Sequence, residues 1–518
     1  MNMLVKKIET KYLLSFCAMT ASVGIGHAQE AQLEKSNSLK PRNVIFILSD
    51  DHRYDYMGFL NTIPWLRTPT LDFMAQNGAY IQNAFVTTAL SSPSRASILT
   101  SLFSHEHTVV DNQAPTPGNL VYFPQYLQKA GYKTAFLGKW HMGDTGWDPQ
   151  PGFNHWEAFQ GQGSYYDVEM NVNGKIVKYR SEEYVTDLLT KHAIEFIEEN
   201  KENPFFVYLS HKAVHDPFIA DSKNRGCYAN EEVPKPDSFK KPYYGNSVLP
   251  SKNVEGKPKI DDWYGEGRMP DWVKQQRESW HGVDYSYHGR TTYEEECKKY
   301  CESLTTMDDY IKQLFDYLKK EGLDQSTLVV YMGDNGFCWG EHGLIDKRNF
   351  YEASVRVPML AYCPELIKPR TVVENIIQNI DIAPTIMEAC GVEKEKQMRG
   401  MSFYPLLVGR EVDNWRNKIF YEYYWEYDFP HTPTMFGVRT ERYKYIKYHG
   451  IWDTNELYDL VADPHETNNL IASPDYQDVA KTMLEDLYDW LENTNGMNIP
   501  MKRTVKHRIG DHRNMYIY

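Results

Sequence analysis

The sequence predicts an α/β fold in which helices flank a central, mostly parallel sheet, with a smaller C-terminal α+β domain that carries a short antiparallel sheet. Two observations support this prediction. Four short apolar runs have the composition of strands buried on both faces, and helix-like stretches separate them. Beyond residue 407, aromatic segments replace the apolar runs, which is typical of antiparallel strands.

Apolar and helix-like stretches alternate through most of the chain. The buried strands are expected at 43–49, 134–137, 204–210 and 327–332, and the helices at 70–77, 123–130, 181–200 and 294–321. In such a fold the ligand site lies at the carboxyl ends of the strands. In the C-terminal part, strands are expected at 418–425 and 442–448 and a helix at about 476–494. The segment 220–293 is rich in Pro, Gly, Trp and charge, and it is expected to form a long loop over the site.

The N-terminus predicts export. Three lysines precede the apolar stretch 12–25, which ends in the small-residue pattern Gly26-His27-Ala28, so residues 1–28 are expected to be a signal peptide. We expect a linker at 29–40, a catalytic domain at 41–407 and a C-terminal subdomain at 408–518. A periplasmic protein follows from this; a lipid-anchored form through Cys17 is less favoured because bulky Phe16 precedes it.

Composition excludes several classes of protein. With 518 residues, 42% of them hydrophobic and 14% aromatic, the chain is too apolar to be disordered. Its net charge of −14 argues against a nucleic-acid partner, which needs basic surface. A mean hydropathy of −0.59, with no long apolar run after residue 28, argues against a transmembrane span. The six cysteines after residue 28 are expected to be mostly core thiols, and any disulfide pairing is left open.

Two pairs of residues with oxygen-bearing side chains predict a metal site. Asp50-Asp51 follows the first buried strand and Asp334-Asn335 follows the fourth. Either pair alone is more typical of a helix cap or a turn. Together they place three carboxylates and one amide oxygen at strand ends, a set that suits calcium or magnesium better than zinc.

The segment Ser91-Ser-Pro-Ser-Arg95 resembles the signature of the formylglycine-dependent sulfatases of the alkaline phosphatase superfamily. The remaining motifs of that family occur in the same order and at similar spacing: Asp50-Asp51, Gly138-Lys-Trp-His141, Ala213-Val-His-Asp216, Gly333-Asp-Asn-Gly336, Gly340-Glu-His-Gly343 with Lys347, Glu456-Leu-Tyr-Asp459 and Asp463-Pro-His-Glu466. The resemblance covers nearly the whole chain after residue 28 and implies an alkaline-phosphatase-like fold.

The resemblance also implies a set of site residues. Ser91 would be oxidised to formylglycine by a sulfatase-maturating enzyme, because a plain serine is a weak nucleophile. Calcium (Ca2+) would be held by Asp50, Asp51, Asp334 and Asn335 together with residue 91. Arg95, Lys139 and Lys347 would bind the nucleophile or the sulfate, His141 would orient the nucleophile, and His215 would protonate the leaving oxygen. Glu341 and His342 are expected only to brace the site, and His105, His107 and Asn112 are equally compatible with substrate contact and with structural hydrogen bonding.

Segments 91–112 and 212–217 are most similar to N-acetylglucosamine-6-sulfatases. This similarity implies that the substrate is a sulfated saccharide, and that the sulfate removed is the 6-O-sulfate of N-acetylglucosamine in glycosaminoglycans or other host glycans. His431 and Arg439 are candidate sugar contacts. Three alternatives stay open: a sulfatase for 2-O-sulfated uronate or 6-O-sulfated N-acetylgalactosamine, a phosphatase or phosphodiesterase of the same superfamily, and a glycan-binding protein without chemistry. The two-zinc phosphatases typically carry Asp-His where this chain has Asp334-Asn335, which favours one metal. Endo or exo action, and whether Ser91 replaces a cysteine, are also open.

Overall fold

The computed structural model describes residues 43–143, 146–239, 269–284, 292–450 and 453–500. The predicted signal peptide and linker therefore lie outside the described residues. Within the described residues, none of the helices combines the length and the apolar character that crossing a membrane requires.

A ten-stranded mixed sheet forms the centre of the fold, in the order β11-β2-β10-β9-β1-β8-β4-β5-β6-β7. Its middle strands β9, β1, β8, β4 and β5 run parallel, and β10, β6 and β7 add antiparallel pairings toward the two edges. The strands are β1 (Asn43–Ser49), β2 (Ala79–Ile81), β4 (Lys133–Lys139), β5 (His155–Phe159), β6 (Glu169–Val172), β7 (Lys175–Lys178), β8 (Phe205–Ser210), β9 (Thr327–Gly333), β10 (Met359–Tyr362) and β11 (Thr371–Val373). The predicted fold class is confirmed.

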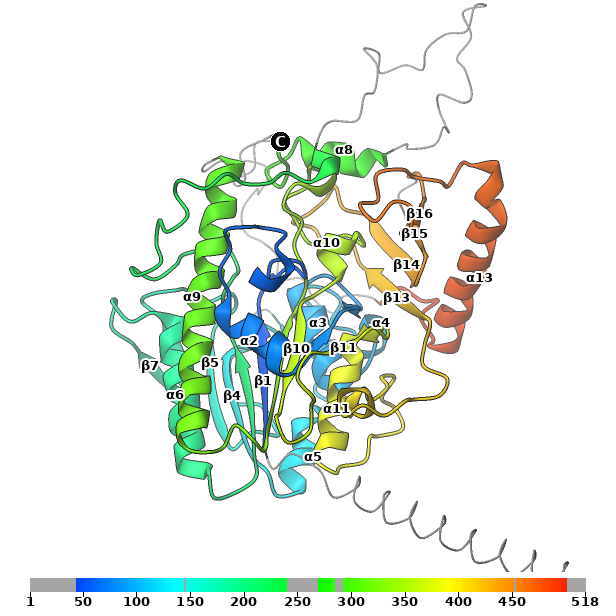
Figure 1. Cartoon of the computed structure of the whole chain (residues 1–518). Helices are drawn as coiled ribbons and strands as arrows, with labels where there is room; N and C mark the ends of the chain where they lie inside the picture. Colours follow the sequence, from blue (N-terminus) through cyan, green and yellow to red (C-terminus); the bar gives the residue numbers. More distant parts are fainter. Residues whose placement is uncertain (1–42, 144–145, 240–268, 285–291, 451–452, 501–518) are drawn as a thin grey trace, which may run out of the picture. The chain divides into compact units, whose positions relative to one another are not determined.

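Helices cover both faces of this sheet (Figure 1). One hydrophobic cluster joins Ile45 and Ile47 of β1 to helices α2 (Pro69–Asn77), α6 (Val185–Asn200) and α9 (Tyr293–Lys320). The other cluster joins Val44, Phe46 and Leu48 to α3 (Ser91–Thr100), α5 (Pro124–Lys129) and α11 (Ile382–Ala389). Alternate residues of one strand thus pack on opposite layers, which explains why β1 is apolar throughout.

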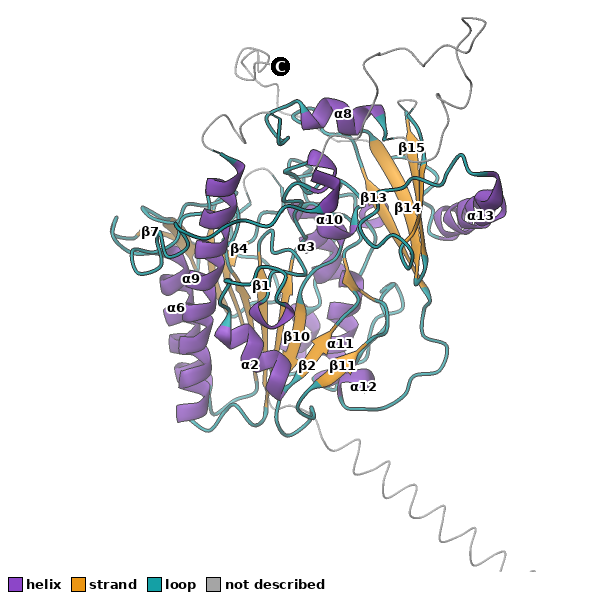
Figure 2. Cartoon of the chain, turned by 45° about the horizontal axis from the view of Figure 1, so that its top comes forward, coloured by secondary structure: helices purple, strands orange, loops and turns teal. Residues whose placement is uncertain are grey.

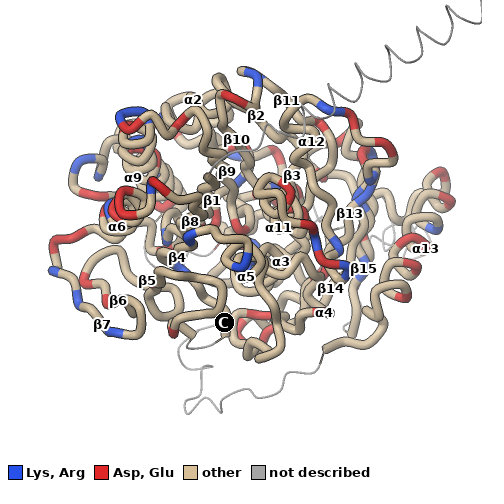
Figure 3. Tube along the Cα trace, turned by 90° about the horizontal axis from the view of Figure 1, so that it is seen from below, with Lys and Arg blue, Asp and Glu red and all other residues tan. Residues whose placement is uncertain are grey.

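A second, four-stranded antiparallel sheet follows in the C-terminal part (Figure 2). It consists of β13 (Lys418–Tyr423), β14 (Thr434–Thr440), β15 (Tyr443–His449) and β16 (Glu456–Asp459), and α13 (Gln477–Asn493) packs against it through Leu487 and Trp490. Charged residues of both signs lie along α13 (Figure 3). The predicted boundary at 407/408 falls between the short helix α12 (Tyr404–Leu407) and β13, and the domain division stays a prediction.

Several short elements lack a sequence signal. They are the β5–β7 meander, the edge strands β2 and β11, the two-stranded pair β3 (Ala84–Phe85) and β12 (Ile377–Gln378), and the short helices α4 (Ser104–His107), α8 (Asp271–Arg277) and α10 (Glu352–Val355). Runs this short have no readable period, and their neighbours in space decide their conformation. In the predicted long loop, the described part contains α8.

The six cysteines after residue 28 are all free thiols, four of them buried: Cys297, Cys301, Cys338 and Cys363. This agrees with the expectation of core thiols.

Gly138 brings β4 unusually close to β8. Its φ of +113° is a backbone conformation that residues with a Cβ rarely adopt, and an added Cβ would lie 1.9 Å from the carbonyl oxygen of Ser210. This close approach directs the next residue, Lys139, to the carboxyl end of the sheet.

We predict that Gly138→Ala lowers the free energy of unfolding by more than about 2 kcal/mol, because it adds both backbone strain and a steric clash. Urea unfolding measures this. Gly131 has a φ of +95° and nothing near the position of a Cβ, so Gly131→Ala measures the cost of backbone strain alone. Gly118 has open space and no positive φ, so Gly118→Ala should leave the free energy of unfolding nearly unchanged. Equal stability of the Gly138 and Gly118 variants would contradict the prediction.

Candidate active site

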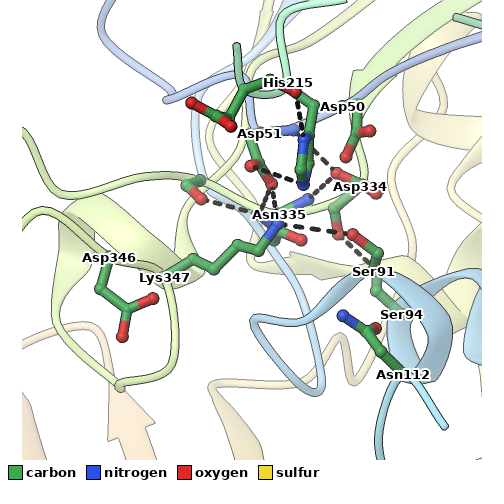
Figure 4. A network of polar contacts seen from close by, with 12 residues as sticks. Asp50, Asp51, Ser91, Ser94, Asn112, His215, Asp334, Asn335, Asp346 and Lys347 are labelled. Carbon is green, nitrogen blue, oxygen red and sulfur yellow. Dashed lines mark hydrogen bonds and ion pairs between the residues drawn. The ribbon is translucent and has the colours of Figure 1, made fainter. Parts of the chain in front are cut away.

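Chain segments far apart in the sequence meet at the carboxyl ends of the central strands (Figure 4). Asp50 and Asp51 directly follow β1, and Asp334 and Asn335 directly follow β9. Lys139 is the last residue of β4, and Ser91 is the first residue of α3. These six sequence-predicted site residues therefore lie together at the carboxyl ends of the central strands.

Ser91 lies between two ammonium groups at a helix N-terminus. Its Oγ is 3.4 Å from Lys139 Nζ and 3.5 Å from Lys347 Nζ. The N-terminal end of α3 adds the partial positive charge of its free backbone N–H groups. Negative charge that develops on or beside residue 91 is therefore stabilised from three sides.

Each of the two lysines also pairs with a carboxylate. Lys139 Nζ forms a buried ion pair with Asp50, and Lys347 Nζ lies 2.5 Å from Asp51 Oδ1. The same Asp51 oxygen accepts a hydrogen bond from Asn335 Nδ2 at 2.7 Å. These alternating charges compensate one another in a part of the protein from which water is nearly excluded.

Arg95 binds residues that surround Ser91. Its guanidinium donates to Asp334 Oδ2 at 2.8 and 3.0 Å, and to the carbonyl oxygen of Lys139 and the hydroxyl of Ser210, both at 2.7 Å. Arg95 therefore links the residue after β9 to the last residues of β4 and β8. Its expected role of binding the nucleophile or the sulfate stays a prediction.

His215 is half-buried, whereas the other predicted metal and catalytic side chains are buried. Its Nδ1 is 3.0 Å from the carbonyl oxygen of Asp216, which can only accept, so Nδ1 carries the proton. Its Nε2 then faces the cluster, 3.7 Å from Asp51 Oδ2. His215 thus stands on the side from which solvent reaches the site.

Burial and charge shift the pKa values of this cluster in opposite directions. Burial alone would raise the pKa of Asp50, but Lys139, with Arg95 and Lys347, holds it well below its usual value. Burial, together with Asp50, raises the pKa of Asp334 to about 6 although Arg95 opposes the rise, and burial lowers the pKa of Lys139 to about 8 against the pull of Asp50.

Burial also lowers the pKa of both histidines well below the usual value. At His141 the neighbouring Lys139 and Arg95 add to the effect, and at His215 Lys347 and Lys139 add to it although Asp50 opposes them. Burial and the neighbouring cations therefore favour the neutral form of both imidazoles.

The oxygen atoms at the centre of the cluster fit a hard divalent cation. Asp50 Oδ1 and Asn335 Oδ1 are buried and, among the described residues, lack a hydrogen-bond partner. One ligand atom from each of Asp50, Asp51 and His215 lies within 4.8 Å of the others. Asp334 is turned toward Arg95 and the backbone N–H groups of Asp51 and Asn335, and its oxygens retain further lone pairs. An oxygen-rich set of this kind suits calcium or magnesium.

Sequence analysis missed a buried hydrogen-bond chain behind the site. The side chain of Asn379 accepts from the backbone N–H of Thr87 at 3.1 Å and donates to Ser94 Oγ at 3.0 Å. Ser94 Oγ in turn donates to the carbonyl oxygen of Asp334 at 2.5 Å. A lone asparagine after a two-residue strand has no sequence signal, so only the structure reveals this link.

The residues with open roles are now placed in structural contacts. His105 pairs with Glu422 at 2.9 Å, His107 Nε2 lies 3.1 Å from Ser97 Oγ, and Asn112 accepts the backbone N–H of Ser92 at 3.1 Å. Glu341 pairs with Arg53 and His342 stacks on Tyr351, as bracing residues would.

The two candidate sugar contacts differ in their surroundings. Arg439 is buried in a two-pronged ion pair with Glu352, at 2.9 and 3.1 Å, which gives it a structural partner away from Ser91. His431 is half-buried in the loop between β13 and β14, and its Nδ1 is 3.1 Å from Gln275 Oε1.

Comparison with known proteins gives a consistent result. The model of the family described as "Sulfatase" matches residues 42–392, and that of the C-terminal region of N-sulphoglucosamine sulphohydrolase matches residues 340–493. The chain is 32% identical to an N-acetylglucosamine-6-O-sulfatase of Bacteroides thetaiotaomicron over 94% of this chain and 92% of that protein. It is 29% identical to the N-acetylglucosamine-6-sulfatase of Capra hircus over 84% and 80% of the two chains.

A solved structure of a protein in complex with its substrate, D-glucosamine-2-N,6-O-disulfate, superposes with a TM-score of 0.76. Its sequence identity is 30%, over 90% of this chain and all of that one.

We predict that Asn379→Ala lowers the free energy of unfolding by about 1–3 kcal/mol, because it leaves the buried N–H of Thr87 without an acceptor. Urea unfolding measures the loss. Asn77→Ala is the matched control, since the Asn77 amide bonds only the nearby carbonyl of Phe73 on a half-buried surface, where water replaces it. A loss at Asn379 no larger than at Asn77 would show that the buried link contributes nothing.

Proposed function

The chain belongs to the sulfatase family and is a sulfatase; we propose that its substrate is the 6-O-sulfate of N-acetylglucosamine or a closely related glucosamine at the end of a glycan chain. The observation that carries the proposal is the position of Ser91 between Lys139 and Lys347 beside the acidic cluster of Asp50 and Asp51. Relatives named for N-acetylglucosamine-6-sulfate, and a structural neighbour whose substrate is a 6-O-sulfated glucosamine, support the choice of sugar.

The nucleophile is proposed to come from Ser91. A maturating enzyme would oxidise the CH2OH group of Ser91 to an aldehyde and would itself accept the two hydrogens that are removed. One oxygen of the hydrate of this formylglycine would attack the sulfur atom as the bond from sulfur to the sugar oxygen breaks and the sugar alcohol departs. Loss of a proton from the other hydrate oxygen would then expel inorganic sulfate and restore the aldehyde. Because Ser91 is fully buried in the folded protein, where a second enzyme would not reach it, we expect the oxidation to precede folding.

The chain's own residues have separable tasks in this proposal. Asp50, Asp51, Asp334 and Asn335 would hold one calcium ion, which supplies positive charge that polarises a sulfate oxygen. Lys139 and Lys347 reach the position of residue 91 and offset negative charge there. His215, on the accessible side, would give a proton from Nε2 to the departing sugar oxygen. Burial, together with the neighbouring lysines, disfavours the protonated form of His215, and the negative charge of a bound sulfate favours it.

An exported, periplasmic location completes the proposal. It rests on the sequence pattern of residues 1–28.

We predict that active protein carries formylglycine at position 91. Mass spectrometry of the peptide that spans residue 91 should show the loss of two hydrogens and reaction with a hydrazide. Ser91→Ala, expressed beside the same maturating enzyme, is the control that cannot change mass. If fully active protein contains only serine at this position, the nucleophile is another group.

We predict that each chain binds one calcium ion. Calcium should restore the activity of chelator-treated protein better than zinc does, because the proposed ligands are all oxygens. Calorimetry on chelator-treated protein should show calcium binding that Asp334→Asn weakens by at least about tenfold, as expected when one of several charged ligands is removed. Asp475→Asn, at an exposed position, should bind calcium as the wild type does. Full activity in rigorously metal-free protein would contradict the proposal.

We predict that kcat/KM is highest for 6-sulfated glucosamines. Four substrates test this: 6-sulfated N-acetylglucosamine, N-sulfated glucosamine 6-sulfate, 6-sulfated N-acetylgalactosamine and a 2-sulfated uronate disaccharide. A pocket that hydrogen-bonds the sugar hydroxyls should disfavour the galactosamine epimer strongly, since its polar groups are then left unpaired. Preference for either of the last two substrates would keep the sulfatase activity but overturn the proposed sugar.

A further inference from the structure

The loop that joins β13 to β14, residues 424–433, is fixed to both sides of the Ser91 site. On one side Arg348, the neighbour of Lys347, donates from Nε to Glu426 Oε1 at 2.8 Å, and its guanidinium lies 3.2 Å from the ring centre of Phe429. On the other side Gln113, the neighbour of Asn112, donates to Asp428 Oδ2 at 2.8 Å. Asn112 itself accepts a hydrogen bond from the backbone N–H of Ser92, the second residue of α3. The loop therefore belongs to the rim of the site.

This loop carries two large aromatic side chains with unusual exposure. Trp425 is 39% exposed and Tyr427 is 57% exposed. Among the large hydrophobic side chains exposed in the described part of the chain, Tyr488 on α13 is the one further aromatic residue. Two exposed rings two residues apart, next to a candidate active site, point to a binding surface, because exposed aromatic area is otherwise costly.

The loop's own hydrogen bonds hold the rings in a defined arrangement. The backbone N–H of Trp425 donates to Thr434 Oγ1 at 2.9 Å, and its indole N–H donates to the carbonyl oxygen of Pro430 at 3.2 Å. The rings of Trp425 and Tyr427 meet edge to face, 6.5 Å apart and at 89°. A surface ordered in this way loses little conformational entropy when a ligand binds.

We propose that Trp425 and Tyr427 form a binding subsite for the next pyranose ring of the glycan, the sugar linked to the reducing side of the sulfated residue. The inference rests on the proposed function and deepens it. A pyranose ring presents C–H groups on its faces, which an aromatic ring binds without any charge. Glu426 of the surrounding loop is already paired with Arg348, whereas the carboxylate of Asp428 is bound by the uncharged amide of Gln113. The subsite therefore suits an uncharged hexose or hexosamine rather than a uronate.

The test compares kcat/KM for 6-sulfated N-acetylglucosamine alone with that for the same residue linked to a neutral hexose. The wild type should prefer the disaccharide, and Tyr427→Ala and Trp425→Ala should each reduce this preference by about threefold to tenfold, the range expected for one aromatic contact. Tyr427→Phe keeps the ring and should keep the preference. Tyr488→Ala, which removes an exposed aromatic residue on α13, is the control and should also keep it. Unfolding temperatures confirm that each variant is folded.

Two results would overturn the subsite. One is a wild type that treats both sugars equally; the other is a disaccharide preference that both alanine variants retain. A stronger preference for a uronate in the linked position would overturn the chemical class. If the wild type hydrolyses neither 6-sulfated sugar but does hydrolyse another sulfate ester, the proposed substrate itself fails, and the subsite fails with it.

Discussion

The buried charges at the carboxyl ends of β1, β4 and β9 are the constraint on which the rest of the structure depends. Three carboxylates and three cationic side chains lie almost without solvent around one serine. A single unpaired charge at such depth costs several kcal/mol, so each of these groups requires its partner in place. The sheet, the tight approach at Gly138 and the N-terminus of α3 can all be understood as the means that bring these partners together.

The strand and helix pattern explains why the core of the fold was predictable. The run 43–49 is apolar at every position because the layers of α6 and α9 and of α3 and α11 cover both faces of β1. The same logic placed the acidic pairs, since polar residues at the ends of adjacent parallel strands necessarily meet. The strand pattern alone did not identify Lys139 and Lys347 as site residues. The family resemblance identified them, and the structure shows that each side chain reaches both a carboxylate and Ser91.

What the sequence did not reveal depends on contacts between distant, short segments. Asn379 follows a two-residue strand and acts through Ser94, 285 positions away, so no local pattern marks it. Arg439 stays a candidate sugar contact, and its buried ion pair with Glu352 is a link that no sequence period indicates. The aromatic loop at 424–433 carries strand-like residues, and only its anchors at Gln113 and Arg348 show that it lies at the rim of the site.

We propose that the ammonium groups of Lys139 and Lys347 beside Ser91 form a sulfate site. The most direct measurement is a crystal structure of protein with unmodified Ser91, bound to 6-sulfated N-acetylglucosamine and calcium. We expect sulfate oxygens within hydrogen-bond distance of Lys139 and Lys347, with the sugar oxygen facing His215 Nε2. Sulfate bound elsewhere, with both lysines still paired only to Asp50 and Asp51, would contradict it.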